Sequence, residues 1–154
     1  MRILVFSDTH NNIDNCIATI ENIKELDMIL HAGDHASDAK DLMFLYPDID
    51  IRYVKGNCDF SNAPSELIIE AENKKIFLTH GHLYNVKSES DYFTLISKGK
   101  ELNCDIIVFG HTHIPFCKKI DNITVLNPGS AKYTQNFGVI EIENGKIGAD
   151  FCEF

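Results

Sequence analysis

The first half of the chain alternates short apolar runs with helical patterns. Residues 3–6 are apolar and end abruptly at Ser7, which predicts a strand buried on both faces. Isoleucines spaced by four, three and three residues from Ile13 onward predict one apolar stripe of a helix over residues 12–26. The same reasoning predicts a strand at 28–30, a helix at 39–46 and a strand at 51–54. Two crossovers of this length indicate parallel strands with right-handed connections.

After Pro64 the pattern changes to hairpins. Apolar segments at 67–69 and 76–78 flank a predicted tight turn at 72–74. A helix is expected at 88–102 and a strand at 106–109. The last third is expected to be all-β, with segments at 116–120, 123–126, 138–142 and 146–151, the last two joined by the turn signal Asn144-Gly145. No repeat or linker interrupts the pattern, so we expect one domain over residues 1–154.

Side chains that can bind a metal follow every strand predicted in the α/β part. They are found in Asp8 and His10, Gly33-Asp34, Gly56-Asn57, His80-Gly81-His82 and His111-Thr112-His113. In an open α/β sheet the carboxyl ends of parallel strands share one edge, where ligands bind, so residues far apart in the sequence can converge there. We expect the D-x-H and H-x-H pairs to be extended, with both side chains on one side.

Each of these residues also has a simpler interpretation. An Asp after a strand is most often a turn or cap residue, Gly56-Asn57 can be an ordinary loop, and Asn127-Pro128-Gly129-Ser130 alone is a type II turn. All seven histidines, however, lie in or beside the strand ends, namely His10, His31, His35, His80, His82, His111 and His113. Direct ligation by His31 or His35 is not expected. A mixed His, Asp and Asn set favours Mn, Fe, Co, Ni or Zn over calcium or an iron–sulfur cluster, and the donor types do not choose among these five.

The composition narrows the range of partners and compartments. The chain has 154 residues, with 14 Lys and Arg against 23 Asp and Glu and a net charge of −9, so it lacks the basic face that nucleic-acid binding requires. Five cysteines without a C-x-x-C pair indicate neither a disulfide framework nor a zinc knuckle, which favours the reducing cytoplasm. The apolar runs are too short to span a membrane, and Asp8 and His10 interrupt the first before a signal peptide could form.

Taken in order, the motifs resemble those of the calcineurin-like metallophosphoesterases, and in particular of their small YfcE-type phosphodiesterase branch. The resemblance rests on Asp8-Thr9-His10, Gly33-Asp34, Gly56-Asn57-Cys58-Asp59, His80-Gly81-His82, Gly110-His111-Thr112-His113 and Asn127-Pro128-Gly129-Ser130. It covers essentially the whole chain. It implies an α/β (α+β) fold, a four-layer α/β/β/α sandwich of two facing mixed sheets flanked by helices.

The resemblance also implies a dinuclear metal site and a division of its ligands. Asp8, His10 and His113 would hold the first metal, Asn57, His80 and His111 the second, and Asp34 would bridge the two. Two divalent cations held in this way activate a bridging hydroxide and clamp the phosphoryl oxygens during in-line attack. The implied function is a metal-dependent phosphodiesterase acting on a small phosphodiester. Relatives often form homodimers or larger assemblies, so a homo-oligomer is consistent with the resemblance.

One position departs from the wider superfamily. Cys58 follows the Gly-Asn pair where many members carry a histidine thought to protonate the leaving oxygen or contact the phosphate, although the YfcE-type branch shares the cysteine. A thiol with an ordinary pKa of about 8.5 is a poor acid at neutral pH, so aryl esters are expected to react best. His82 is the candidate for substitute acid or phosphate contact, and its alternative is orientation of a ligand. The alternative for Cys58 is packing beneath the metals.

Three other functions stay open. The same metal pair serves phosphomonoesterases and nucleotide pyrophosphohydrolases, which differ in the loops around it. A non-catalytic scaffold, like the retromer subunit of the same superfamily, is disfavoured because side chains at all seven ligand positions are intact. A nuclease is disfavoured by the net charge of −9.

Overall fold

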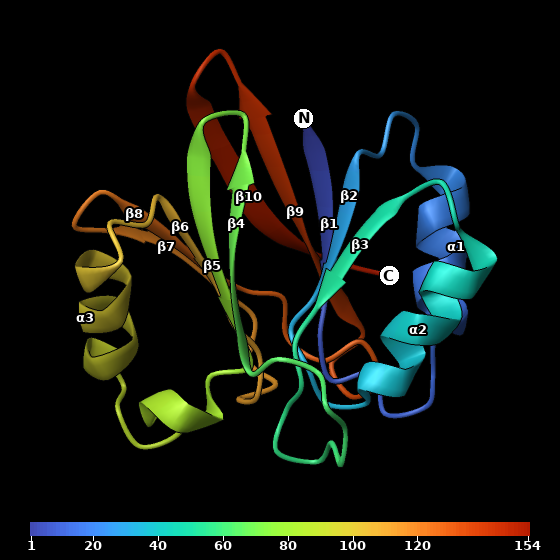
Figure 1. Ribbon diagram of the computed structural model, residues 1–154, viewed down its shortest axis with the longest axis horizontal. Helices are drawn as coiled ribbons and strands as arrows, with labels where there is room; N and C mark the ends of the chain where they lie inside the picture. The colour runs from blue at the N-terminus through green and yellow to red at the C-terminus, as the bar shows by residue number, and fades with distance from the viewer.

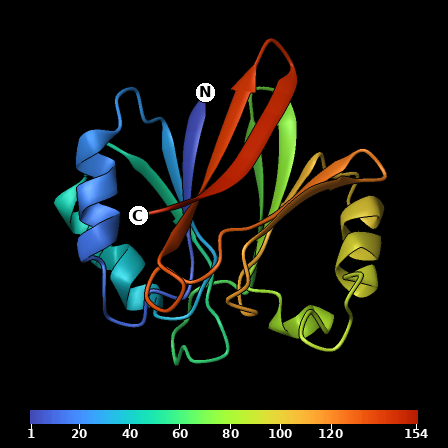
Figure 2. The same cartoon turned by 180° about the vertical axis from the view of Figure 1, so that it is seen from behind.

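Two five-stranded β-sheets pack face to face, and helices cover their outer sides (Figure 1). The computed structural model describes all residues, 1–154. Helices α1 (Asp14–Asn22) and α2 (Ala36–Leu45) lie outside one sheet, and helix α3 (Phe93–Glu101) lies outside the other. The view from behind also shows the two helical layers on opposite sides of the molecule (Figure 2). The predicted α/β class and the four-layer α/β/β/α sandwich are therefore confirmed.

The first sheet has the strand order β10-β9-β1-β2-β3. Its strands are β1 (Arg2–Phe6), β2 (Met28–His31), β3 (Asp50–Tyr53), β9 (Asn136–Glu143) and β10 (Lys146–Glu153). The first three are parallel, as the βαβαβ pattern predicts, and β9 pairs antiparallel with β1. Parallel pairing places the carboxyl ends of β1, β2 and β3 at one edge.

The second sheet has the strand order β4-β5-β6-β8-β7. Its strands are β4 (Glu66–Ala71), β5 (Lys74–Thr79), β6 (Ile106–Val108), β7 (Phe116–Ile120) and β8 (Ile123–Asn127). Strands β5, β6 and β8 are parallel, and β4 and β7 close the two edges as antiparallel partners. The carboxyl ends of β5 and β6 lie at the same lower edge of Figure 1 as those of the first sheet.

Alternate residues of β1 show how the layers are held together. Ile3 and Val5 belong to the apolar cluster between the sheets, while Leu4 and Phe6 belong to the cluster beneath α1 and α2. A third cluster lies between the second sheet and α3. These four residues of β1 are fully buried, because the strand has an apolar layer on both faces.

Three hairpins end in two-residue turns whose residues have left-handed backbone angles. They are Glu72-Asn73, Asp121-Asn122 and Asn144-Gly145, with φ between 48° and 75°. Two consecutive left-handed residues match the right-handed twist of the flanking strands. The predicted hairpins are confirmed.

Helix boundaries differ from the predicted ones. Helix α1 is shorter than residues 12–26, because Ile23 is already extended, with ψ 128°. Helix α2 begins at Ala36 rather than at residue 39, since Asp59 accepts a hydrogen bond of 2.8 Å from the Ala36 backbone N–H. Helix α3 begins at Phe93 rather than at residue 88, and a 3-10 helix, η1 (His82–Tyr84), precedes it. The structure contains no helix that is both long enough and apolar enough to span a membrane.

Candidate metal centre

The loops that follow β1, β2, β3, β5 and β6 meet at one edge of the sandwich, at the bottom of Figure 1. These loops carry every predicted metal ligand. Two groups of side chains there have potential ligand atoms within 4.8 Å of one another: Asp8, His10 and His113, and Asp8, Asp34 and His80. Asp8 belongs to both groups, so the two groups form one continuous cluster.

Asp8 is fully buried and is held by one of its two carboxylate oxygens. Its Oδ2 accepts hydrogen bonds from Ser7 Oγ at 2.5 Å and from the His111 backbone N–H at 3.1 Å. Its Oδ1 has no hydrogen-bond partner. The neighbours of Asp8 therefore fix the carboxylate and leave one oxygen directed at the cluster.

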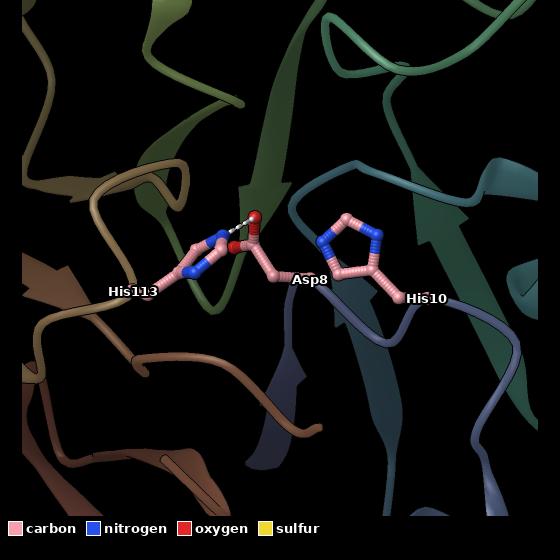
Figure 3. Close-up of side chains that lie close together, drawn as sticks. All are labelled: Asp8, His10 and His113. Carbon is pink, nitrogen blue, oxygen red and sulfur yellow. Dashed lines mark ion pairs between the residues drawn. The ribbon is translucent and has the colours of Figure 1, made fainter. Parts of the chain in front are cut away.

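His113 and His10 lie on opposite sides of Asp8 (Figure 3). His113 Nε2 is 3.0 Å from Asp8 Oδ1, close enough for an ion pair, although the geometry is not that of a hydrogen bond. The buried His10 Nε2 has no hydrogen-bond partner and lies 3.9 Å from Asp34 Oδ2. Burial lowers the pKa of His10, against the opposing charges of Asp34 and Asp8. A neutral imidazole offers a lone pair, which is the form that binds metals.

The expectation that these pairs are extended is wrong. Asp8 and His10 have φ of 53° and 45°, and His111 and His113 have φ of 68° and 60°. All four residues are in the left-handed region, which costs energy for residues other than glycine and persists only where the surrounding structure holds it. The pairs still converge, because each chain turns sharply after its strand instead of continuing in the β conformation.

Asp34, His80 and Asn57 form the other half of the cluster. His80 Nε2 lies 3.4 Å from Asp34 Oδ1 and 3.2 Å from Asn57 Oδ1, and the other ring nitrogen of His80 is 2.7 Å from the Ala32 carbonyl oxygen. If Nδ1 donates to Ala32, the neutral ring has its lone pair on Nε2, facing two oxygens. His80 Nε2, Asp34 Oδ1 and Asn57 Oδ1 then all present lone pairs to one another. A cation bound among them would relieve this repulsion.

Asp34 and His80 shift each other's pKa in opposite directions. Burial alone lowers the pKa of His80, but its hydrogen bond with Asp34 and the charges of Asp8 and Asp34 outweigh burial and raise that pKa above its ordinary value. Burial likewise opposes ionisation of Asp34, yet His80 and the Cys58 backbone N–H hold the pKa of Asp34 well below its usual range. A cation and a proton compete for His80 Nε2, so acid weakens metal binding.

His111 lies against His80, with ring centroids 4.9 Å apart. Burial, followed by the charges of His80 and Lys87, lowers the pKa of His111 to about 4. The ring is therefore neutral at physiological pH. The structure brings all seven predicted ligands to this one edge, with Asp8, Asp34 and His80 buried and His10, His111 and His113 half-buried, and Asn57 exposed.

The loops that carry the predicted ligands are hydrogen-bonded to the motif Asn127-Pro128-Gly129-Ser130. Gly129 has φ of +84°, as the predicted type II turn requires. The Asn127 side-chain amide donates to the Gly110 carbonyl at 2.9 Å and to Thr112 Oγ1 at 3.0 Å, and Ser130 Oγ donates to the Asp8 carbonyl at 2.8 Å. This motif therefore positions the two loops that carry Asp8 and His111.

Cys58 and His82 take different places. Cys58 is exposed, so the interpretation that it packs beneath the metals is wrong; its backbone N–H donates to Asp34 Oδ1 at 3.0 Å. Desolvation and the charge of Asp34 raise the pKa of its thiol, which makes it a weaker acid. His82 lies beside His80, with ring centroids 5.4 Å apart, and its buried Nδ1 has no hydrogen-bond partner. Burial and the charge of His80 lower the pKa of His82, which disfavours the protonated form that an acid catalyst needs.

Two residues that contact the site, Tyr133 and Lys132, are not predicted by the sequence pattern. The Tyr133 ring stacks on the His113 ring, with centroids 5.3 Å apart and an interplanar angle of 19°. Its centroid is also 5.3 Å from that of the His10 ring. Lys132 Nζ donates to the His10 carbonyl at 3.1 Å. Both residues follow the Asn127–Ser130 turn, and no local spacing points from them to histidines more than a dozen residues away.

His31 and His35 lie near the cluster without joining it. Both nitrogens of the fully buried His31 have partners, with Nε2 3.0 Å from Thr9 Oγ1 and Nδ1 accepting from the Gly33 backbone N–H at 3.2 Å. His35 Nδ1 is 3.1 Å from Asn11 Oδ1. His31 therefore has no lone pair free for a metal.

His31 should make the metal-free protein sensitive to acid. Burial lowers its pKa to about 4, against an ordinary value of 6.5. Between pH 6.5 and about 4 the unfolded chain binds a proton at this position and the folded chain does not, so stability falls as pH falls, by about 1.4 kcal/mol per unit at most. Urea unfolding measures the free energy of unfolding at pH 7 and at pH 5. The difference between the two values should be about 2 kcal/mol smaller in His31→Gln than in the native protein. An unchanged difference would contradict a buried neutral His31.

The donor set fits a metal ion. Isolated buried polar atoms such as Asp8 Oδ1 and His10 Nε2 are costly unless something binds them. Nitrogen and oxygen donors without thiolate favour transition-metal dications. Asp8 belongs to both groups of donors, and the two oxygens of Asp34 lie 3.4 Å from His80 Nε2 and 3.9 Å from His10 Nε2, so carboxylates reach both halves of the cluster. Such an arrangement can hold two cations close together.

Comparison with known proteins agrees with this geometry. The model of the calcineurin-like phosphoesterase superfamily domain matches residues 1–145. A probable metallophosphoesterase of Bacillus subtilis, YsnB, is 31% identical over 162 residues, covering 99% of this chain and 91% of that protein. The phosphodiesterase MJ0936 of Methanocaldococcus jannaschii is 27% identical over 146 residues, covering 84% of this chain and 83% of that protein. A zinc complex of Vps29 from Entamoeba histolytica shares the fold, with a TM-score of 0.77, 24% identity and 99% and 98% coverage.

A metal-dependent phosphoester hydrolase is the class of enzyme that the fold, the donor cluster and the matches define. The chain belongs to the calcineurin-like phosphoesterase superfamily, and its relatives place it with the small phosphodiesterase branch. Divalent metal ions are its cofactors.

Proposed function

We propose that this protein hydrolyses a small phosphodiester at a dinuclear centre, as a single domain over residues 1–154. The observation that carries the proposal is the cluster in which Asp8, Asp34 and three histidines converge, together with two buried atoms that lack any hydrogen-bond partner. A relative named as a phosphodiesterase supports diester chemistry. The cytoplasm as compartment and a homo-oligomeric assembly stay predictions.

The proposed ligands divide as two sets of three around one bridging carboxylate. Asp8, His10 and His113 bind the first ion, and Asn57, His80 and His111 bind the second. Asp34 bridges, because its Oδ1 faces His80 Nε2 at 3.4 Å and its Oδ2 faces His10 Nε2 at 3.9 Å. Mn²⁺ or Ni²⁺ is the preferred pair, with Fe, Co and Zn as alternatives.

Two bound dications supply a water-derived nucleophile at neutral pH and compensate charge on the phosphoryl oxygens. The chain's own part is to hold donors rigidly. Ser7 and the His111 backbone N–H fix the Asp8 carboxylate, the Ala32 carbonyl fixes the His80 ring, and the Cys58 N–H fixes Asp34. Preorganised donors of this kind need no rearrangement when charge develops in the transition state.

Leaving groups that need little protonation should react fastest. Both candidates for a proton donor are poorly suited, since the pKa of His82 lies below and that of Cys58 above its ordinary value. His82 is half-buried beside His80 with Nδ1 unpartnered, which suits contact with a phosphate oxygen. An aryloxide departs without an acid, whereas an alkoxide does not.

Hydrolysis of two chromogenic esters tests the proposed function. The protein is stripped with EDTA, then supplied with Mn²⁺ or Ni²⁺ and assayed with bis-p-nitrophenyl phosphate and p-nitrophenyl phosphate. We expect metal-restored turnover that prefers the diester. A preference for the monoester would instead favour a phosphomonoesterase. No turnover of either ester by folded, metal-loaded protein would contradict catalysis and favour a scaffold role.

Tyr133 should stabilise the first metal through its ring rather than through its hydroxyl. The ring contacts the imidazoles of both His113 and His10, at 5.3 Å in each case. Tyr133→Ala should weaken the binding of one of the two ions by about tenfold, in the range typical of groups that orient ligands. Calorimetric titration with Mn²⁺ measures this, and Tyr133→Phe, which keeps the ring, should bind as the native protein does. Equal loss in both variants would contradict a role for the ring.

A further inference from the structure

A separate pocket lies beside the metal centre and shares one loop with it. It encloses about 280 Å³ between residues 86–92 on one side and Thr112 and Ile114 on the other. Thr112 and Ile114 are the sequence neighbours of His111 and His113, so the pocket adjoins the proposed ligands. Figure 1 shows the segment between η1 and α3 at the outer side of the edge where the strand-end loops meet.

Lys87 is the basic residue of this pocket. Its side chain is exposed and forms no ion pair. In a chain of net charge −9, an unpaired cation beside the site is available for an anionic ligand.

Glu89, the acidic residue in the pocket lining, is hydrogen-bonded to Thr94. Its two oxygens accept hydrogen bonds from Thr94 N at 2.7 Å and Thr94 Oγ1 at 2.6 Å, at the start of α3. The bonds with Thr94 lower the pKa of Glu89, which stays ionised in that role. The other polar groups of the pocket include the hydroxyls of Ser90 and Tyr92, which can donate hydrogen bonds.

We propose that this pocket, the Lys87 pocket, binds a second phosphate group of the substrate. The inference rests on the proposed phosphodiesterase function and adds a chemical class, a phosphodiester of which one ester group bears a further phosphate. The pocket is smaller than a typical site for a drug-sized ligand, and it suits a phosphate with part of a sugar. A lysine ammonium holds phosphate as a point charge, and Val86 and Ile114 offer apolar contact to the carbon skeleton.

A matched pair of substrates tests the Lys87 pocket. Thymidine 5′-(p-nitrophenyl phosphate) is compared with the same compound carrying a 3′-phosphate, since both release p-nitrophenolate. The native protein should show a KM about tenfold lower for the 3′-phosphorylated compound, with little change in kcat. Lys87→Met should abolish that preference. Lys146→Met, which removes an exposed lysine at the β9–β10 turn, should retain it.

Direct binding separates failure of the pocket from failure of the enzyme. Thymidine 3′,5′-bisphosphate and thymidine 5′-monophosphate are titrated calorimetrically into Mn²⁺-loaded protein. A preference for the bisphosphate that Lys87→Met removes supports the pocket even if neither ester is hydrolysed, an outcome that would overturn only the phosphodiesterase function. Equal affinity in the native protein, or a preference unchanged in Lys87→Met, would overturn the proposal.

Discussion

Replacement of Asp34 by asparagine should lower kcat/KM for a phosphodiester on the order of 1000-fold, ~4 kcal/mol of transition-state stabilisation. Asp34 faces both donor groups, with one oxygen 3.4 Å from His80 Nε2 and the other 3.9 Å from His10 Nε2. Asparagine removes the negative charge and one of the two oxygens, so it cannot serve both ions. The loss should exceed the roughly 10–100-fold typical of groups that only orient a ligand. Steady-state kinetics with bis-p-nitrophenyl phosphate at saturating Mn²⁺ measures it.

Asp41→Asn is the matched control for this substitution. Asp41 is an exposed residue of α2, so its replacement removes the same charge away from the cluster and should leave kinetics unchanged. Thermal unfolding of both variants shows whether the fold persists. A folded Asp34→Asn protein with native activity and native metal content would contradict the bridging role.

Gly56→Ala should cost about 100-fold in kcat/KM, although it adds only one methyl group. A Cβ at residue 56 would overlap Asp34 Oδ1 and lie 2.6 Å from the Asp34 backbone nitrogen, closer than Cβ atoms are found to approach backbone. The Asp34 carboxylate must then move away from the position between His80 and His10. Because Gly56 does not have a left-handed backbone, the loss reports this contact rather than strain.

Gly148→Ala is the control for a methyl group without a clash. At Gly148, in β10, the nearest atom to an added Cβ is the Glu141 carbonyl oxygen at 4.0 Å. This variant should keep full activity and metal affinity. If Gly56→Ala were equally active, the tight fit of Asp34 against residue 56 would not matter for catalysis.

Much of the fold could be predicted because its signals are local. The apolar run of β1 and the isoleucine stripe of α1 each fit one period, and turns such as Asn144-Gly145 carry their own backbone preference. The convergence of the site residues also follows from one rule, that parallel strands place their carboxyl ends at a shared edge. The motif order, read as a resemblance, supplied the family.

The predictions from the sequence were wrong or incomplete where contacts with distant residues determine the local structure. Helix α2 begins at Ala36 because Asp59 caps it from 23 residues further on, which no helical pattern contains. The left-handed turns at Asp8 and His10 are held by tertiary hydrogen bonds, including those from Ser130 and Lys132 to their backbone carbonyls. Tyr133 was missed for the same reason, since only the folded chain brings its ring onto His113.

The number of metal ions that activity requires tests the central claim most directly. EDTA-stripped protein is titrated with Mn²⁺ by calorimetry, and hydrolysis of bis-p-nitrophenyl phosphate is followed over the same additions. A dinuclear centre predicts two ions bound per chain, with activity rising as the second ion binds. Full activity with a single bound ion, or two bound ions without turnover of any phosphoester, would contradict it.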